Sequence, residues 1–280
     1  MDAAVTIDAH QHYWRFDAVR DGWITDDMAQ LRRDFLPRDV WPGMVAAGID
    51  GVVAVQADQS EAETAFLLDL AAEHAFVRGV VGWVDLRAPD LADRLSRWRE
   101  DRALKGFRHI AQAEPDDFLA RPEVVQAIAT IGEHGYTYDI LVYPRQLAAA
   151  TTLAERCPGV RFILDHCAKP PIATGEMDAW RQGIERLARC RNVSCKVSGL
   201  VTEAARGNWN DPHLIPYLDA TIDAFGADRL LFGSDWPVCL LAATYGEVAG
   251  VIDRWASRLT SDERTMLFGG TAAAVYRLEN

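Results

Sequence analysis

Short apolar runs recur along the chain and alternate with segments that have a helical pattern. Most of the runs are apolar at nearly every position, as at 51–55. This pattern is typical of parallel strands that are buried on both faces. We therefore expect eight strands, at 6–12, 51–56, 79–85, 104–110, 137–143, 161–166, 193–199 and 230–235.

Helix signals fall between these runs. Ser60 with Glu63, and Thr260 with Glu263, have the spacing of capping boxes at helix starts. The chain contains no Gly/Ser linker, repeat or charge block that would divide it. A strand followed by a helix, repeated eight times, predicts an α/β protein with a (β/α)8 TIM-type barrel, built as a single domain over residues 1–280.

One connection is longer than this architecture needs. Residues 13–50 follow the first expected strand, whereas most connections in such folds are short. The segment leaves the carboxyl end of a strand, where barrel enzymes place their active sites. We expect a long loop over the C-terminal mouth of the barrel that acts as a partial lid. An ordinary packed insertion is the alternative.

Composition narrows the class of function. Apolar residues make up 49% and charged residues 25% of the chain, and the net charge is -12. This acidic balance argues against nucleic-acid and membrane partners. The sequence begins without a signal-peptide pattern and has no apolar run of about 18 residues. Its five cysteines are odd in number and lack CxxC spacing, which argues against a disulfide framework and fits a cytoplasmic protein.

The residues with the clearest chemical meaning lie at the ends of the first and last expected strands. His10 and His12 are two positions apart, so they point to the same side of a strand. Asp235 follows the eighth run. A closed barrel brings the first and eighth strands together. Two imidazoles and a carboxylate that converge in this way can hold a metal ion or order a water molecule.

The chain resembles the amidohydrolase superfamily, whose first strand ends in His-x-His and whose eighth ends in an aspartate. It is most similar to the sugar-lactonase branch, which includes L-fuconolactonases and L-rhamnonolactonases. The matching segments run in order along nearly the whole chain, at 7–14, 32–37, 81–86, 105–109, 164–170, 195–200 and 232–237.

This resemblance implies hydrolysis of a lactone and suggests roles for the site residues. Asp235 is the expected general base, and apolar surroundings that include Trp236 would raise its pKa. His166, at the end of the sixth strand, is expected to polarise the carbonyl, either alone or through a metal. The alternatives are an aspartate that caps the turn before Pro237 and a core histidine bonded to backbone.

Two departures from the superfamily pattern concern metal. The fourth expected strand ends in Arg108-His109-Ile110 instead of a bridging lysine, and the fifth contains no histidine. A binuclear centre is therefore not expected. The remaining set can hold at most one divalent ion such as zinc, and we expect that no cofactor is strictly required. The conditional ligands are His10, His12, His166 and Asp235.

Several further residues are expected to bind substrate. Arg108 can bind a carbonyl or carboxylate; its alternative is a buried ion pair with Asp139. His109 should face the opposite side of the strand, and Lys196, if it points inward, needs an acidic partner. The other candidates for substrate binding are Lys169, Trp14, Trp23 and Trp236. The alternative for Lys169 is an exposed surface position, and the alternative for each tryptophan is packing in the core.

We therefore expect an enzyme that opens a sugar-derived aldonolactone to the free acid, with a small-molecule sugar lactone as its partner. One alternative within the superfamily is a dicarboxylate lactonase or a decarboxylase. Such substrates require several cationic residues, and the strand ends offer few besides Arg108. The alternative from another class is a non-catalytic sugar-binding barrel, which has no need of the histidine and aspartate set.

Overall fold

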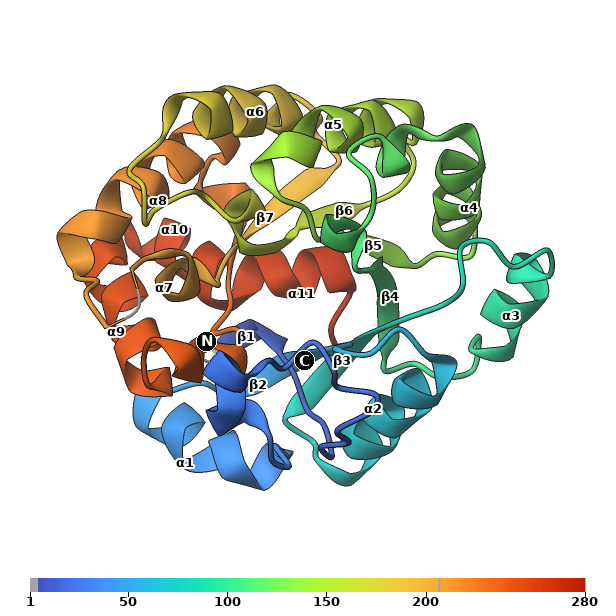
Figure 1. Cartoon of the computed structure of the whole chain (residues 1–280), viewed down its shortest axis with the longest axis horizontal. Coiled ribbons are helices and arrows are strands. Elements are labelled where there is room, and N and C mark those ends of the chain that lie inside the picture. Colours follow the sequence, from blue (N-terminus) through green and yellow to red (C-terminus); the bar gives the residue numbers. More distant parts are fainter. Residues whose placement is uncertain (1–4, 206, 280) are drawn as a thin grey trace.

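The eight expected strands are present and form one parallel sheet. The structure is a computed structural model that describes residues 5–205 and 207–279. Its strands pair in sequence order from β1 to β8, as Figure 1 shows. Each lies within or overlaps one predicted run, and all eight are mostly buried on both faces. They are β1 (Ile7–Gln11), β2 (Gly51–Val55), β3 (Val77–Gly82), β4 (Leu104–His109), β5 (Thr137–Ile140), β6 (Phe162–Leu164), β7 (Val193–Val197) and β8 (Leu230–Phe232).

Helices surround this sheet and complete a (β/α)8 barrel (Figure 1). The predicted capping box of Thr260 and Glu263 is confirmed. At the other predicted box only half is present, because Ser60 accepts from the amide of Glu63, whereas the Glu63 carboxylate accepts from the amides of Ala57 and Asp58. The α-helices are α1 (Pro37–Ala47), α2 (Glu61–Glu73), α3 (Leu91–Arg97), α4 (Pro122–Glu133), α5 (Leu147–Arg156), α6 (Asp178–Ala188), α7 (Leu200–Glu203), α8 (Asp211–Phe225), α9 (Tyr245–Ala256), α10 (Ser261–Thr265) and α11 (Thr271–Tyr276).

The segment 13–50 is only partly the long loop that the sequence suggests. Its second part is the barrel helix α1, which packs against α9. The loop before α1 contains a short 3₁₀ helix (Asp26–Leu31) and is tied to the segment after β8, because the Gln30 amide donates to the Leu240 carbonyl at 2.7 Å. Since that segment leaves the carboxyl end of β8, the loop lies at the C-terminal mouth.

The barrel closes between β1 and β8 at the end where the strands finish. The amide of His12 donates to the carbonyl of Trp236 at 2.7 Å, and the amide of Asp235 donates to that of His10 at 2.9 Å. Deeper in the seam, the Asp8 carboxylate accepts from the Ser234 amide at 2.8 Å and the Tyr245 hydroxyl at 3.1 Å. These bonds connect the two ends of the sheet through residues on either side of the predicted site.

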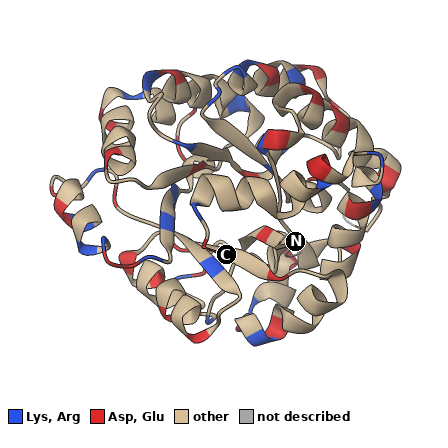
Figure 2. Ribbon diagram, turned by 180° about the vertical axis from the view of Figure 1, so that it is seen from behind, with Lys and Arg blue, Asp and Glu red and all other residues tan. Residues whose placement is uncertain are grey.

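The opposite end of the barrel is covered by α11. This helix lies across the middle of the ring in Figure 1 and packs on β1 and β8. Its Tyr276 enters a small inner cluster of apolar side chains and donates a hydrogen bond to Asp139 of β5 at 2.7 Å. Figure 2, seen from behind, shows that many of the acidic and basic residues lie on the outer helices. Among the described residues, no helix is both long and apolar enough to cross a membrane.

One close approach between strands gives a test of the barrel packing. A Cβ added at Gly106 of β4 would lie 2.0 Å from the Thr137 hydroxyl and 2.8 Å from the Thr137 carbonyl oxygen of β5. We expect Gly106→Ala to lower the free energy of unfolding by about 2 kcal/mol, as overpacking does. Denaturant titration followed by circular dichroism measures this.

Gly159→Ala is the matched control, because a Cβ there would meet nothing within 4 Å. Both substitutions restrict the unfolded chain equally, so their difference isolates the native contact. We expect Gly159→Ala to leave the stability unchanged or slightly increased. Equal stability of the two variants would show that β4 and β5 do not approach as closely as described.

Candidate active site

Both histidines of the first strand face the aspartate that follows the last strand. The Nε2 atoms of His10 and His12 are 3.1 Å apart. The Asp235 carboxylate lies 3.4 Å from Nε2 of His12 and 3.7 Å from Nε2 of His10. The prediction that the two rings point the same way is therefore confirmed, and barrel closure brings Asp235 to them.

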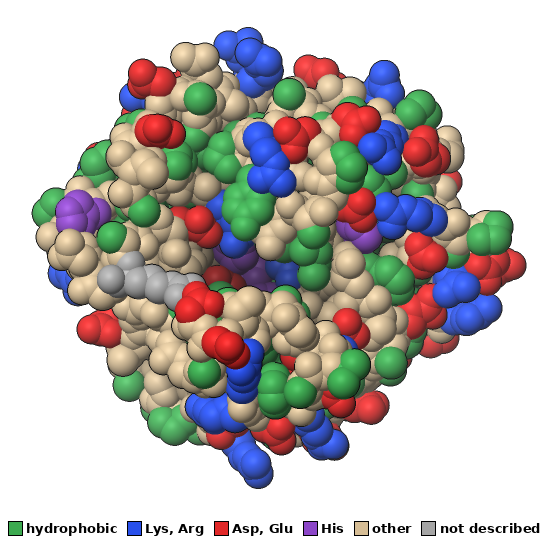
Figure 3. All heavy atoms as spheres, viewed as in Figure 1, with side chains coloured by type: hydrophobic (Ala, Val, Ile, Leu, Met, Phe, Trp, Pro, Cys, Tyr) green, Lys and Arg blue, Asp and Glu red, His purple; other side chains and the backbone are tan. Residues whose placement is uncertain are grey.

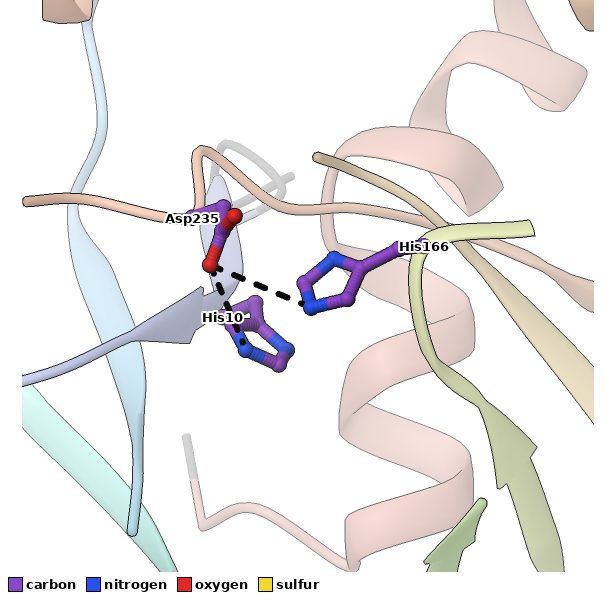
Figure 4. A group of neighbouring side chains, drawn as sticks. All are labelled: His10, His166 and Asp235. Atoms are coloured by element: carbon purple, nitrogen blue, oxygen red, sulfur yellow. Dashed lines mark ion pairs between the residues drawn. The ribbon is translucent and has the colours of Figure 1, made fainter. Parts of the chain in front are cut away.

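His166 reaches the same point from an unusual backbone turn. β6 ends at Leu164, so His166 does not end a strand as predicted. Residues 166–169 all have positive φ angles of 50–58°, and Asp235 has a φ of 59°. Such left-handed backbone is strained for residues other than glycine and is concentrated at functional sites. The turn places Nε2 of His166 3.9 Å from Asp235, as Figure 4 shows.

Three contacts hold this left-handed turn in place. The Trp180 indole donates to the Cys167 carbonyl at 2.7 Å, and the ring Nδ1 of His166 lies 2.9 Å from the Ser198 hydroxyl. The His166 ring also packs against Gly199, where a Cβ would lie 2.7 Å from Nδ1. Gly199 has a φ of 64°, so glycine serves both the backbone and the space for the imidazole.

Electrostatics leave the carboxylate charged and two of the rings neutral. Burial favours a raised pKa for Asp235, but the imidazoles of His166, His10 and His12 outweigh burial and lower it below the ordinary value. The expectation of a raised pKa is therefore wrong. Burial lowers the pKa of His166 to about 4. Burial, and then the charge of Lys196, hold the pKa of His10 well below its ordinary value.

Arg108 lies beneath the histidines inside the barrel. Its guanidinium donates to Asp165 at 2.9 Å and to the side chain and carbonyl of Gln56. The alternative ion pair with Asp139 is therefore wrong; Lys196 of β7 occupies that carboxylate at 2.6 Å. All three guanidinium nitrogens therefore donate hydrogen bonds to protein groups. Arg108 supports the site from below, and its contact with substrate stays a prediction.

The structure shows which way the side chains of His109 and Lys196 point. His109 points outward, stacks on Phe118 and pairs with Glu114 at 2.9 Å. Lys196 points inward and has the acidic partners that burial requires, because its Nζ is also 3.0 Å from Asp165. The same Nζ lies 3.1 Å from Nδ1 of His10.

At the mouth, Lys169 is near the site but is paired. Its ammonium lies 3.2 Å from Glu203 and 5.7 Å from the centre of the Tyr143 ring. The charge of Asp235 is among those that raise the pKa of Lys169 against the opposing effect of burial. Figure 3 shows a hollow in the middle of this face with histidine at its floor and charged side chains at its edge. Lys169 therefore remains a candidate for substrate binding.

The three candidate tryptophans belong to one aromatic cluster. Trp14 is 2% exposed and Trp236 is 3% exposed, whereas Trp23 is 40% exposed. Trp14 lies edge-on to Trp23 and Phe35, and Phe35 in turn meets Trp236 with ring centres 5.4 Å apart. This packing fixes the loop before α1 on the segment after β8. Of the three rings, Trp23 has the most surface open to a ligand, and stacking on substrate stays a prediction for each.

Comparisons with known proteins now identify the family. The amidohydrolase family profile matches residues 7–278. The chain belongs to the amidohydrolase family. This amidohydrolase is 45% identical to the L-fucono-1,5-lactonase of Burkholderia multivorans, over 98% of this chain and 97% of that protein. It is 39% identical to the L-fucono-1,5-lactonase of Burkholderia ambifaria, over 98% and 96% of the two chains.

A solved structure of a similar protein has the same fold and contains bound zinc. A crystal structure of an amidohydrolase from Burkholderia multivorans with bound zinc has a TM-score of 0.95 and 46% identity to this chain, and covers 99% of this chain and 100% of that one. In the present amidohydrolase, His10, His166 and Asp235 offer ligand atoms that lie within 4.8 Å of one another. His12 is not within that set.

The donor chemistry of these three residues fits a metal ion. Two imidazole nitrogens and one carboxylate oxygen, all buried, form the N/O combination that zinc takes in proteins. With neutral rings and an ionised carboxylate, the three groups also have the protonation that metal ligands require. The residues His10, His166 and Asp235 would hold the ion, and His12 would lie beside it.

Several residues of this site were missed by sequence reasoning. Asp165 and Gln56 support Arg108, Ser198 contacts His166, and Glu203 pairs with Lys169. For Asp165 the sequence did contain a signal. Asp165 follows an apolar run, and a charged residue buried at such a place needs a partner of opposite charge. The other three carry no comparable signal, because each is defined by a neighbour that is distant in sequence.

Proposed function

We propose that this amidohydrolase opens a sugar-derived aldonolactone, similar to L-fuconolactone, to the free acid. The enzyme is thus a lactonase, a carboxylic ester hydrolase. The observation that carries the proposal is the convergence of His10, His166 and Asp235 in a chain 45% identical to an L-fucono-1,5-lactonase. The relatives do not favour the dicarboxylate lactonase, the decarboxylase or the non-catalytic barrel.

Asp235 takes the role of general base in this proposal. Its carboxylate is ionised and lies buried at the floor of the mouth beside His12 and His166, where an attacking water can pass a proton to it, and the lowered pKa limits its strength as a base. The water oxygen forms a bond to the lactone carbonyl carbon, and the bond from that carbon to the ring oxygen then breaks. The proton held by Asp235 passes to the ring oxygen, which leaves as a hydroxyl group.

His166 stabilises the carbonyl oxygen as negative charge develops on it. Its ring is neutral and its Nε2 faces the space beside Asp235. In the metal-free tautomer that has its proton on Nε2, the Ser198 hydroxyl donates to Nδ1 and Nε2 can donate to the oxyanion. A bound divalent ion would supply Lewis-acid stabilisation of the same oxygen.

The charge balance of the site supports a neutral substrate. Each cation near the strand ends has a carboxylate close by: Arg108 has Asp165 at 2.9 Å, and Lys169 has Glu203 at 3.2 Å. Lys196 is likewise paired, with Asp139 at 2.6 Å. A dianionic lactone would have to compete with these internal partners. A sugar lactone presents hydroxyl groups, which can hydrogen-bond to both members of an ion pair.

A cytoplasmic setting in sugar breakdown accords with this activity. The five cysteines are free, as in proteins of reducing compartments. The net charge of -12 disfavours nucleic acid and anionic membranes as partners, so the sugar lactone is the partner that we propose.

The role of Asp235 is tested by Asp235→Asn, which keeps the shape of the side chain and removes the base. We expect kcat to fall by about 100-fold or more, in the range of general-base loss, with the fold intact by circular dichroism. Asp223→Asn, an exposed carboxylate on α8, is the matched control and should keep full activity. A folded Asp235→Asn enzyme with a near-normal lactonase rate would remove Asp235 from this role.

Substrate charge gives a second test. Because the cations of the site are compensated, neutral five- and six-membered sugar lactones should have much higher kcat/KM than dicarboxylate lactones. Steady-state rates over a panel of both classes measure this. A higher kcat/KM for a dianionic lactone would overturn the neutral-substrate proposal and favour the dicarboxylate lactonase.

Metal content gives a third test. We expect at most one divalent ion per chain, at partial occupancy, and substantial activity after its removal. Lactones are activated esters, so Asp235 and a donor from His166 can supply the several kcal/mol otherwise given by a Lewis acid. Elemental analysis and rates before and after chelation check both statements. Two ions per chain, or complete loss of activity that zinc alone restores, would contradict the metal-optional mechanism.

A further inference from the structure

A tryptophan that follows β3 directly, Trp83, faces the inside of the barrel mouth. A Cβ at its neighbour Gly82 would lie 2.6 Å from the Thr64 side chain of α2, so Gly82 faces the outer helices. Val84, on the other side, belongs to the large apolar cluster that the helices share. Because side chains alternate along an extended chain, Trp83 points inward, as does Val81 of the small inner cluster.

The indole of Trp83 is not part of the apolar core. The residue is only partly buried, and it is neither a member of the two apolar clusters of the described residues nor packed at their edges. Among residues 5–205 and 207–279, no aromatic ring packs against the indole. A large apolar side chain that contributes so little to the core, at the mouth of a barrel, is typical of a ligand-binding surface.

A series of contacts fixes the position of this indole. Its N–H donates to Nδ1 of His109 at 3.4 Å, and Nε2 of the same ring lies 2.9 Å from the Glu114 carboxylate. Glu114 is also paired with Arg87 at 3.0 Å, and the His109 ring stacks on Phe118. An indole N–H can only donate, so His109 supplies the acceptor that holds it. The indole is therefore oriented before any ligand arrives.

Trp83 lies across the mouth from the groups that are proposed to act on the lactone. The eight strands form a ring in sequence order, so β3 lies opposite β7. His166 and Asp235 follow β6 and β8, which are the two neighbours of β7. A ligand in the hollow of this face (Figure 3) therefore has the imidazole and the carboxylate on one side and the indole on the other.

We propose that Trp83 binds the substrate by stacking its indole on one face of the lactone ring, and that His109 is the positioning residue that holds the indole. This inference rests on the proposed lactonase function. A sugar lactone carries its hydroxyl groups around the ring edge and has C–H bonds on its faces, which an uncharged aromatic surface can cover. The open acid has no ring face, so this contact favours the lactone over its product.

The affinity test uses the 1,5-lactam analogue of L-fuconolactone, whose ring nitrogen slows hydrolysis, and isothermal titration calorimetry. We expect Trp83→Ala to bind this lactam about tenfold more weakly than the wild type, as loss of an aromatic contact does. The same variant should raise KM for the lactone and leave kcat little changed, because the contact binds substrate and transition state alike. Trp83→Phe keeps a ring and should bind the lactam nearly as the wild type does.

Two results separate this inference from the proposed function. An active enzyme in which Trp83→Ala has the lactam affinity and KM of the wild type would overturn the inference alone. A wild-type enzyme that neither binds the lactam nor opens neutral sugar lactones would overturn the proposed function and the inference with it.

Tryptophan fluorescence reports the contact itself. Trp83→Phe should bind the lactam but lose most of the change in emission that binding causes in the wild type. Trp41→Phe is the matched control, because Trp41 is 44% exposed and lies on α1. This control should keep both the binding and the change in emission. An undiminished change in Trp83→Phe would show that the indole does not touch the ligand.

The role of His109 is tested by a double-mutant cycle with Trp83. His109→Ala frees the indole without removing it, so it should weaken lactam binding severalfold in the wild type and have no further effect in Trp83→Ala. Equal weakening in both backgrounds would show that His109 does not act through the indole, and would overturn its positioning role.

Discussion

The hydrogen-bonded seam between β1 and β8 is the constraint on which the site depends. The amides of His12 and Asp235 close the barrel by donating to the carbonyls of Trp236 and His10 at 2.7 and 2.9 Å. The same residues carry, or adjoin, the side chains that converge. Asp8 reinforces the seam from below, because its carboxylate accepts from the Ser234 amide at 2.8 Å. The hydrogen bonds that close the barrel therefore also fix the geometry of the site, and a shift of this seam would displace His10, His12 and Asp235.

Beneath this seam the barrel encloses charge instead of a purely apolar core. Arg108, Lys196, Asp139 and Asp165 are all buried, and each contacts an opposite charge within 3.0 Å. Breaking such a buried pair strands an uncompensated charge, so the network tolerates few substitutions. This network places charged donors and acceptors directly behind the His10 ring.

A strained left-handed turn also positions side chains of the site. Four consecutive residues with positive φ carry His166 and Lys169 away from the end of β6, and the indole of Trp180 holds the turn. The turn directs the imidazole towards Asp235 and the ammonium towards the mouth. Asp235 and His166 thus come from the ends of two strands that are separated by β7, and their side chains meet at 3.9 Å.

The sequence by itself determined the barrel, because eight apolar runs separated by helical segments admit few other arrangements. It also determined which side chains share a face of a strand, since period-2 alternation placed His10 with His12 and separated Arg108 from His109. Only the tertiary structure decided the partners: Arg108 pairs with Asp165 instead of Asp139, and Lys196 faces His10. It also lowered the pKa of Asp235, placed His166 in a left-handed turn and made residues 37–47 a helix within the expected loop. Alternation along a strand specifies the face on which a side chain lies, whereas partners and electrostatics depend on distances between strands that are far apart in sequence.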